Sequence, residues 1–468
     1  MEKGKNRNSF TGSIGFVLAA AGSAVGLGNI WRFPYLAAKD GGGLFLVIYL
    51  FLALTFGFTL LTTEISIGRK TKQSPLTAYT QVKKGWGFLG VLACLVPVII
   101  MPYYCVIGGW VVKYLIAFLT GDGVNAARDE YFSEFIAADI QPIVMTLIFL
   151  FVVAFIIFRG VEKGIESSSK VIMPILLLLV IGIAIFSVTI RHTDADGVTR
   201  TGLEGLRICL VPNLEGMTIK GFFTVLLDAM GQLFFSLSVA MGIMITYGSY
   251  VKDDANLVKS INQIEIFDTA VAFLAGIMII PAVYTFMGTE GMAAYGPSLM
   301  FVSLPKVFAA MGKVGNVIGV LFFAMVLFAA ITSAMSVMEA VVSSLMDRFH
   351  MSRLKATVVE TAIALIGGIF VCLGYNKLRF DITLPNGDIE QLLGVMDYIS
   401  NYVLMPLVAI GTCILIGWVV KPKTVIEEVE QSGCKLGRKQ LYIIMIKFIA
   451  PILLLILLLK SFGILTVI

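Results

Sequence analysis

Charged residues are scarce in this sequence. Only 14% of its 468 residues are Asp, Glu, Lys or Arg, whereas ordinary soluble domains carry about 25%. Hydrophobic residues make up 58%, which is too much for a single soluble core, because such cores stop growing at roughly 250–300 residues. Disordered chains, secreted disulfide scaffolds and nucleic-acid binders are therefore poor fits. Apolar runs continue over about 20 residues instead of alternating over about 10, so we predict an all-α integral membrane protein.

Histidine is almost missing as well, and cysteine shows no useful spacing. The two histidines, His192 and His350, both fall in predicted loops. Six cysteines are scattered without a CxxC or a Cys/His metal pattern, so the sequence indicates neither a disulfide framework nor a zinc site. We expect no catalytic residues and no metal other than any alkali cation, because haem, di-metal and histidine-triad chemistry all need more histidine. The protein is predicted not to be an enzyme.

Apolar segments long enough to cross a bilayer occur eleven times. We place them near 13–37, 42–68, 88–119, 138–158, 167–190, 221–249, 262–286, 314–346, 356–374, 391–419 and 441–466. Lys and Arg collect before the first span and after the second, fourth, eighth and tenth spans, whereas the loop after the third is acidic. The positive-inside bias then predicts a cytoplasmic N-terminus and, since the count is odd, an extracytoplasmic C-terminus.

Two spans contain Gly and Ser at mid-depth, at residues 19–29 and 234–242. Such residues can unwind a helix where the freed backbone lines a cavity; a small-residue packing face is the alternative. The two segments lie five spans apart, which favours a 5+5 inverted-repeat transporter core with discontinuous helices 1 and 6 and a site between them. The expected units are 1–12 (N-terminal gate segment), 13–190 (first repeat), 191–220 (extracellular loop), 221–419 (second repeat), 420–440 (cytoplasmic loop) and 441–468 (helix 11).

Several motifs together resemble the neurotransmitter:sodium symporter family, in particular its bacterial amino-acid transporter branch. They are AVGLGNIWRFPY at 24–35 with GGG at 41–43, EISIGR at 64–69, QLFFS at 232–236 and AAITS at 329–333. The resemblance covers essentially the whole chain. It implies a sodium-coupled symporter that works by alternating access in a plasma (inner) membrane, as a monomer or weak homodimer.

Two sodium sites follow from the resemblance. The first set of ligands comprises Ala24, Asn29, Ser236 and Asp268, and the second comprises Gly22, Val25, Ala329, Thr332 and Ser333. The last three residues of the second set share one helix face at i, i+3 and i+4. Without the resemblance, the hydroxyls of Thr332 and Ser333 would be read as bonding back to their own helix.

Asp268 departs from the pattern of many animal members, which have Asn there and a Ser four residues later that helps to hold chloride. This chain has Asp268 and Ala272, while Tyr49, Gln232 and Ser236 match the other chloride ligands. An ionised Asp would repel chloride, so we predict that Asp268 balances sodium in its place and that no chloride is required. An intramembrane carboxylate is expensive and seldom merely structural. Proton antiport through Asp268 is a further hypothesis.

The substrate site implied by the resemblance is apolar. Amide groups at Gly26, Leu27 and Gly28, with the Tyr104 hydroxyl, would bind a carboxylate, and carbonyls near Ala24, Phe235 and Ser236 would meet an ammonium group. Amine-transporting members have Asp in place of Gly26, so an amino-acid substrate is favoured. The side-chain pocket is formed by Ile100, Tyr104, Phe235, Ser238, Met241, Ser333 and Val337.

That pocket favours hydrophobic or aromatic L-amino acids, because it has no residue to pair a charged side chain. Ala240, where Gly is common, adds a methyl that could narrow the site. A sodium-coupled carrier of small neutral amino acids or osmolytes is therefore one alternative. A non-transporting amino-acid sensor is a second, although a sensor should carry a cytoplasmic effector domain.

Gates on both sides are also implied by the resemblance. Arg32 and Asp397 match the extracellular charged pair, with Tyr104 and Phe235 as the lid above substrate. Arg7 and Asp347 match the intracellular pair, supported by Phe10 and Tyr250. The spacing of Gly164 and Pro174 also resembles the family's, which implies that the start of the fifth span unwinds and lets water reach the second sodium site. Pro alone would kink the helix, and the polar run between them favours unwinding.

Overall fold

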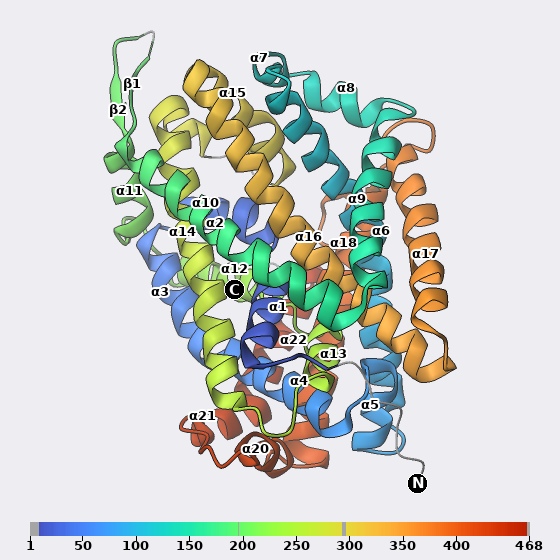
Figure 1. The fold of residues 1–468 in the computed structure, drawn as a ribbon. Coiled ribbons are helices and arrows are strands. Elements are labelled where there is room, and N and C mark those ends of the chain that lie inside the picture. Colours follow the sequence, from blue (N-terminus) through green and yellow to red (C-terminus); the bar gives the residue numbers. More distant parts are fainter. Residues whose placement is uncertain (1–8, 195, 293–295, 466–468) are drawn as a thin grey trace.

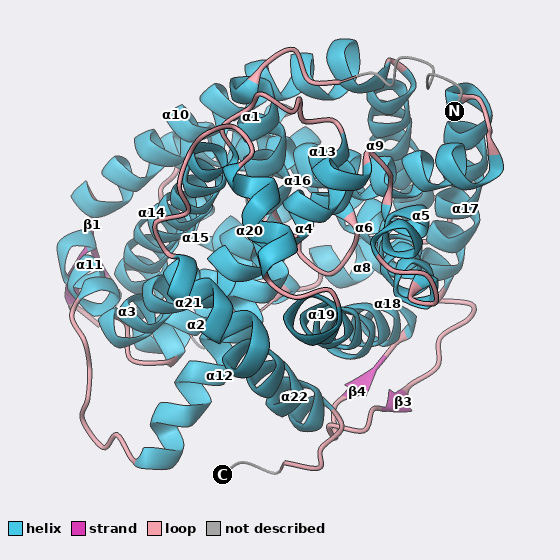
Figure 2. Cartoon of the chain, turned by 90° about the horizontal axis from the view of Figure 1, so that it is seen from below, coloured by secondary structure: helices cyan, strands magenta, loops and turns pink. Residues whose placement is uncertain are grey.

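The structure is a computed structural model, and it describes residues 9–194, 196–292 and 296–465. Within these residues, ten helices are long and apolar enough to cross a membrane, and an eleventh span is the bent pair Ser13–Ala24 and Gly28–Lys39. Figure 1 shows the spans gathered into one bundle, and Figure 2 shows it end-on, with helices around a helical interior. The predicted all-α membrane fold with eleven spans is confirmed.

The first five spans are long helices joined by short connections. Their elements are α1 (Ser13–Ala24), η1 (Gly28–Arg32) and α2 (Phe33–Lys39) in span one; α3 (Gly43–Leu52), η2 (Ala53–Gly57) and α4 (Phe58–Thr71) in span two; then α5 (Pro75–Val82), α6 (Gly87–Leu119), α7 (Gly123–Ala126), α8 (Tyr131–Ala137), α9 (Gln141–Phe158), η3 (Val161–Glu166) and α10 (Ser167–Thr189). The η elements are π-helical turns that continue their helices. A hairpin of β1 (Arg191–Thr193) and β2 (Thr199–Thr201) follows, and α11 (Gly202–Leu210) begins with a Thr201/Glu204 capping box.

The second group of spans begins after that hairpin. Its elements are α12 (Ile219–Ser236), α13 (Ile243–Ser249), α14 (Leu257–Gly291), η4 (Leu299–Ser303), α15 (Leu304–Ala310), α16 (Lys313–Phe349), α17 (Arg353–Leu373), β3 (Ile382–Thr383), β4 (Ile389–Glu390), α18 (Leu392–Asp397), η5 (Tyr398–Leu404), α19 (Met405–Ile414) and η6 (Leu415–Val419). The chain ends with α20 (Lys423–Glu430), α21 (Lys439–Ile444), η7 (Met445–Ile449) and α22 (Ala450–Ser461).

The first and sixth spans are broken where Gly and Ser occur in the sequence. α1 ends at Ala24, and the helix resumes at Gly28 with its axis bent by 54°. Between α12 and α13 the backbone takes positive φ angles at Ser238 (52°), Ala240 (62°) and Gly242 (76°). The first two conformations are strained for residues with a side chain. The break is supported by Glu64, whose Oε1 accepts the Ala240 amide at 2.6 Å. The predicted discontinuity of helices 1 and 6 is confirmed.

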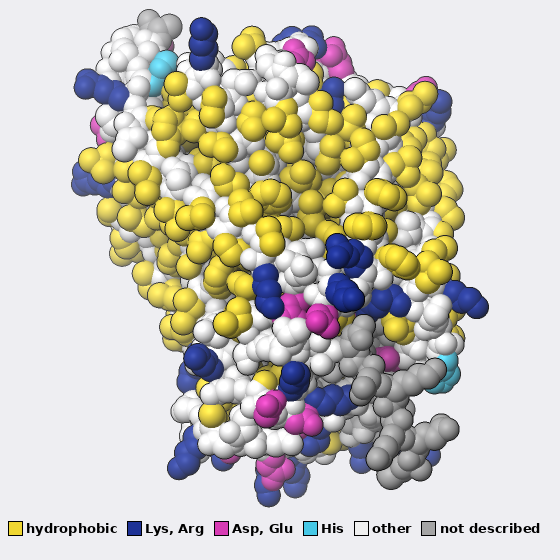
Figure 3. Space-filling view, in the orientation of Figure 1, with side chains coloured by type: hydrophobic (Ala, Val, Ile, Leu, Met, Phe, Trp, Pro, Cys, Tyr) yellow, Lys and Arg dark blue, Asp and Glu magenta, His cyan; other side chains and the backbone are white. Residues whose placement is uncertain are grey.

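The outer surface is apolar over a broad band. In Figure 3, hydrophobic side chains cover most of the visible face, while Lys, Arg, Asp and Glu collect below this band and, in smaller number, above it. Large apolar residues such as Phe151 on α9 and Leu178 on α10 are exposed. A surface of this kind is stable in hydrocarbon and not in water. The protein is a multi-pass membrane protein.

Candidate functional site

A small cavity lies where the two helix breaks meet, and its volume is about 30 Å³. The residues around it come from α1 and η1, from α6, from the end of α12 and the break after it, and from α16. They are Ser23, Ala24, Gly26, Leu27, Gly28, Asn29, Ile100, Tyr104, Phe235, Ser236, Ser238, Met241, Ser333 and Val337. The structure thus brings together, around one cavity, every residue that the sequence suggested for substrate. It adds Ser23, which the sequence analysis did not single out.

Gly26 and Gly28 are required by close approaches inside this site. A Cβ atom on Gly26 would lie 2.7 Å from Ser333 Oγ and 3.4 Å from the Tyr104 hydroxyl. On Gly28 it would lie 3.0 Å from the ring of Phe235. A side chain at either position would therefore displace cavity-lining groups. The backbone of the first break is left accessible to a small ligand because these positions have no side chain.

The two breaks also contact each other directly through serine hydroxyls. Ser238 Oγ donates to the Ser23 carbonyl at 3.0 Å, and the two Ser side chains lie 3.1 Å apart. These bonds occupy backbone groups that unwinding has freed. The sequence could have indicated Ser23, because it lies in the broken segment of the first span, where a polar side chain can reach the break of the sixth span.

Asp268 on α14 is fully buried and collects three donors. Its Oδ1 accepts from Ser236 Oγ at 2.7 Å and Asn29 Nδ2 at 2.8 Å, and its Oδ2 lies 3.4 Å from the Tyr49 hydroxyl. Hydrogen bonds of this kind make a buried carboxyl group tolerable. Three residues suggested for the first sodium site thus lie in contact, and Ala24 lines the cavity beside them.

Groups near this carboxyl are ordered by further bonds. Gln232 Nε2 donates to the Gly28 carbonyl at 3.1 Å, and Ser236 Oγ lies 3.1 Å from Asn29 Oδ1. Ala272, one turn after Asp268, is buried and contributes only a methyl group. Of the groups suggested by the chloride-site resemblance, Tyr49 and Ser236 thus bind the carboxyl of Asp268, and Gln232 binds the neighbouring Gly28 carbonyl.

Carbonyl oxygens of the first break converge on Ser333 of α16. Its Oγ lies 3.1 Å from the Ser23 oxygen and 3.5 Å from those of Gly22 and Val25. Unwound backbone carbonyls and hydroxyls are the oxygen donors that hold Na⁺ in transporters of this architecture. Gly22, Val25 and Ser333 are thus brought together, and their chemistry fits an alkali cation.

Thr332 behaves differently in this structure. Its hydroxyl bonds back to the carbonyls of Phe328 and Ala329, at 3.0 Å each. That is the arrangement expected for a hydroxyl satisfied by its own helix. The bond to Ala329 joins two of the three α16 residues of the suggested set.

Phe10, suggested for the intracellular gate, packs among aromatic rings at the side predicted to be cytoplasmic. It is buried, and its ring centroid lies 5.7 Å from those of Phe16 and Tyr247 and 6.2 Å from that of Tyr250. Its amide donates to the Tyr250 carbonyl at 3.2 Å. We call Phe10, Tyr250 and Asp347 the N-terminal gate. Arg7 lies outside the described residues.

A buried ion pair supports this gate and was missed by the sequence analysis. The Tyr250 hydroxyl donates to Glu339 Oε1 at 2.6 Å, and Arg353 binds both Glu339 oxygens at 2.8 Å. Asp347 Oδ2 accepts the Ser74 amide at 2.7 Å. A signal for Glu339 was present, since it is an acid inside an apolar span. Its partner Arg353 begins the next helix.

The opposite end is held by fewer contacts. Asp397 Oδ1 accepts from Tyr103 at 3.1 Å and from Asn401 at 2.5 Å. The Arg32 guanidinium lies 5.7 Å from the ring centroid of Tyr402. Between these two described residues, Arg32 and Asp397, no ion pair within 4 Å is formed. The expected charged pair Arg32–Asp397, which we call the Arg32 gate, is therefore not in direct contact, and each member has another partner.

The start of the fifth span is wound, contrary to the expected unwinding between Gly164 and Pro174. η3 passes directly into α10, and Pro174 lies inside α10. Glu166 explains this difference: its carboxylate accepts the amide and hydroxyl of Thr11 and pairs with Lys170 at 2.7 Å. The N-terminal segment therefore docks on the polar run and stabilises the wound form.

Comparisons with known proteins agree on one family. The model of the sodium:neurotransmitter symporter family matches residues 7–134 and 136–467. The sodium-dependent transporter YhdH of Bacillus subtilis is 32% identical over 97% of both chains. A sodium-dependent transporter of Haemophilus influenzae is 31% identical over 98% of both. The sodium- and chloride-dependent taurine transporter of Rattus norvegicus is 26% identical, covering 89% of this chain and 72% of its own.

A solved structure is similar throughout. The crystal structure of MhsT in complex with L-phenylalanine has 34% identity and a TM-score of 0.84, covering 98% of this chain and 100% of MhsT. The similarity extends over the broken helices and all the spans described above. The family contains transporters and not enzymes. This chain belongs to the sodium:neurotransmitter symporter family of sodium-dependent transporters.

Proposed function

We propose that the protein is a sodium-coupled, chloride-independent symporter that imports hydrophobic or aromatic L-amino acids by alternating access. The observation that carries this proposal is the cavity between the two breaks, where bare backbone faces apolar side chains. The same fold holds L-phenylalanine in MhsT. Its N-terminus is cytoplasmic in this proposal and its C-terminus extracytoplasmic.

An α-carboxylate fits the first break. Amide groups at Gly26, Leu27 and Gly28 lie at the start of the second half of a split helix, where the helix dipole favours an anion. The Gly26 amide donates to Asn29 Oδ1 at 3.4 Å, a long bond that a bound carboxylate would replace. The Tyr104 hydroxyl reaches the same place, because a Cβ on Gly26 would lie 3.4 Å from it. An Asp at this position would collide with Ser333, so the site suits ligands that bring their own carboxylate.

Two sodium ions would take the oxygen-rich positions on either side of this break. One set is Ala24, Asn29, Ser236 and Asp268; the other is Gly22, Val25, Ala329, Thr332 and Ser333. Sodium and substrate would each order the same broken helix, so each would raise the affinity for the other. This reciprocity is the physical basis of symport.

Chloride independence rests on Asp268. The groups that resemble chloride ligands, Tyr49 and Ser236, direct their hydroxyls at its carboxylate, and Ala272 provides no hydroxyl. A fixed negative charge would balance sodium without a chloride ion. If Asp268 binds a proton while the carrier returns without sodium and substrate, the protein would also export protons, which is proton antiport.

A carrier of small neutral amino acids or osmolytes is the second candidate, and the cavity volume of about 30 Å³ favours it. Against it, Ile100, Met241 and Val337 present only apolar groups, and a flexible Met adapts to bulky side chains. The substrate panel below separates the two candidates.

The experiment is uptake into proteoliposomes with an inward sodium gradient. We expect uptake of leucine, tyrosine or tryptophan that disappears when choline replaces sodium and persists when gluconate replaces chloride. Competition by glycine or betaine, but not by these three, would contradict the substrate assignment. A requirement for chloride would contradict the role of Asp268. Amino-acid binding without any transport would favour the sensor.

A further inference from the structure

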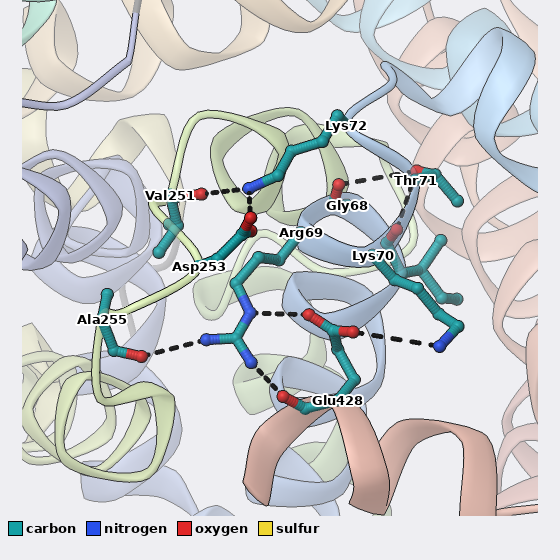
Figure 4. A network of polar contacts seen from close by, with 10 residues as sticks. Gly68, Arg69, Lys70, Thr71, Lys72, Val251, Asp253, Ala255 and Glu428 are labelled. Atoms are coloured by element: carbon teal, nitrogen blue, oxygen red, sulfur yellow. Dashed lines mark hydrogen bonds and ion pairs between the residues drawn. The ribbon is translucent and has the colours of Figure 1, made fainter. Parts of the chain in front are cut away.

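A fully buried arginine lies outside the cavity, near the end of α4. The side chain of Arg69 has no exposed surface. Its Nε donates to Glu428 Oε1 at 2.7 Å, and its Nη2 donates to the Glu428 carbonyl. Its Nη1 donates to the Ala255 carbonyl at 2.9 Å. Figure 4 shows the guanidinium between α20 on one side and the loop 251–256 on the other. One side chain thus joins three segments that are far apart in the sequence.

The same helix end holds this loop at a second point. Lys72 Nζ donates to the Val251 carbonyl at 2.6 Å and pairs with the Asp253 carboxylate at 2.6 Å. On the α20 side, Lys70 lies 3.9 Å from Glu428. The last turn of α4 and the residue that follows it therefore bind loop 251–256, and α20 covers the buried arginine (Figure 4).

The inner half of the sixth span is fixed to α4 as well. A Cβ on Gly68 would lie 2.0 Å from the Ile245 carbonyl oxygen, and one on Gly248 would lie 2.3 Å from that of Ile65. The backbones of α4 and α13 therefore touch, beside Arg69. A shift of loop 251–256 relative to α4 would therefore also displace α13.

Loop 251–256 and the residue before it support the N-terminal gate. The Phe10 amide bonds to the Tyr250 carbonyl at 3.2 Å, and Lys252 Nζ donates to the Thr11 carbonyl at 3.2 Å. Both bonds bring the N-terminal segment to rest on this stretch of chain. The position of the loop consequently decides whether Phe10 can close the pathway.

We propose that Arg69 and Glu428 are positioning residues for this gate, and that α20 is a latch that holds loop 251–256 in the place where the N-terminal segment docks. When one partner of a buried ion pair is removed, the other charge is left unpaired in a dry site. Movement of the loop would rehydrate Arg69, so loss of Glu428 favours the conformation with the gate open. The inference rests on the proposed function, because the gate matters only in alternating access.

Hydrogen–deuterium exchange of the purified full-length protein tests the latch. The variant is Glu428→Gln, and the matched control is Glu427→Gln, whose side chain on the same helix is 61% exposed and pairs with an exposed Lys423. Without sodium or amino acid, Glu428→Gln should raise exchange about tenfold in peptides from 9–24 and 243–256. Peptides from α22 should not change, and Glu427→Gln should match the wild type.

The sodium dependence of exchange distinguishes an effect on the gate from a general loss of stability. The carbonyls of the first break converge around Ser333 while the gate is closed, so a bound cation favours the closed state. The sodium concentration that restores protection should be about tenfold higher in Glu428→Gln than in the wild type. Unchanged exchange in both gate peptides, or an equal rise across all helices including α22, would overturn the latch.

A second variant covers the case in which Glu428→Gln does not purify. Asp253 is 65% exposed and pairs with Lys72 on the other side of the loop. Asp253→Asn should raise exchange of the same peptides about threefold, and no rise would contradict the latch. Failure of the proposed function gives a different result. If sodium did not change the exchange of the wild type, the sodium sites would be contradicted, but the comparison of Glu428→Gln with the wild type without sodium would still test the latch.

Discussion

The two ends of the proposed pathway are held by different contacts. The N-terminal gate has a buried aromatic cluster around Phe10, and the Thr11–Glu166 contact and the Glu339–Arg353 ion pair support it. At the Arg32 gate, Arg32 and Asp397 each bind other groups. This conformation is thus held at the N-terminal side by aromatic packing and a buried ion pair, whereas the opposite side has hydrogen bonds to Asp397 and no direct Arg32–Asp397 ion pair. Mutations at the two ends should therefore differ in size.

The largest expected effect is at the buried ion pair. Arg353→Ala should destabilise the protein by about 3–5 kcal/mol, because Glu339 would remain buried without its charge partner. Thermal melting in detergent measures the change. Arg32→Ala is the matched variant at the other end and should melt within a few degrees of the wild type. Equal losses from the two variants would remove the distinction between the ends.

The next largest effect is expected from truncation of Phe10. Phe10→Ala removes a buried ring and should destabilise the closed N-terminal gate by about 1.5–3 kcal/mol. Because the ring is part of a gate, the effect should fall on the conformational equilibrium: exchange of α1 amides should rise while α22 stays protected. Phe10→Trp is the control and should retain closure. Faster exchange in α22 would point to general unfolding instead.

A single hydrogen bond at the Arg32 gate should matter less. Tyr103→Phe removes one donor to Asp397 while Asn401 remains, so we expect a loss of about 0.5–1.5 kcal/mol. Thermal melting tests this, and Asn401→Asp should cost more because it places two carboxylates together. A Tyr103→Phe loss as large as that of Arg353→Ala would show that the outer contacts are as strong as the inner ones.

A pH dependence is expected between α2 and α3, outside both gates. Burial, and then the nearby charge of Asp228, raise the pKa of Asp40 to about 6 from its usual value near 3.8. The folded state therefore binds a proton more tightly than the unfolded state, so this group's contribution to stability falls as pH rises from about 4 to 6 and is flat above that. Asp40→Asn should flatten the melting profile in this window. An unchanged profile would contradict the assignment.

Sequence reasoning recovered the fold because apolar spans and helix breaks depend on local chemistry, whereas the residues around the cavity came from the resemblance to the family. Gly and Ser in an apolar span indicate an unwound segment whatever the rest of the chain does, as at residues 234–242. The wound fifth span was not predictable in that way. It depends on Thr11 reaching Glu166, a contact between residues 155 positions apart, and on which conformation the gate adopts. The Glu339–Arg353 pair likewise forms only once α16 and α17 are packed.

The central claim is that the junction of the two breaks binds sodium together with an amino acid, with Asp268 in the role of chloride. The most direct measurement is calorimetric binding of L-phenylalanine and L-leucine to the purified protein, in sodium chloride, sodium gluconate and choline chloride. The account predicts equal affinity in both sodium salts and at least about tenfold weaker binding in choline. Equal binding in choline, or binding that requires chloride, would contradict it.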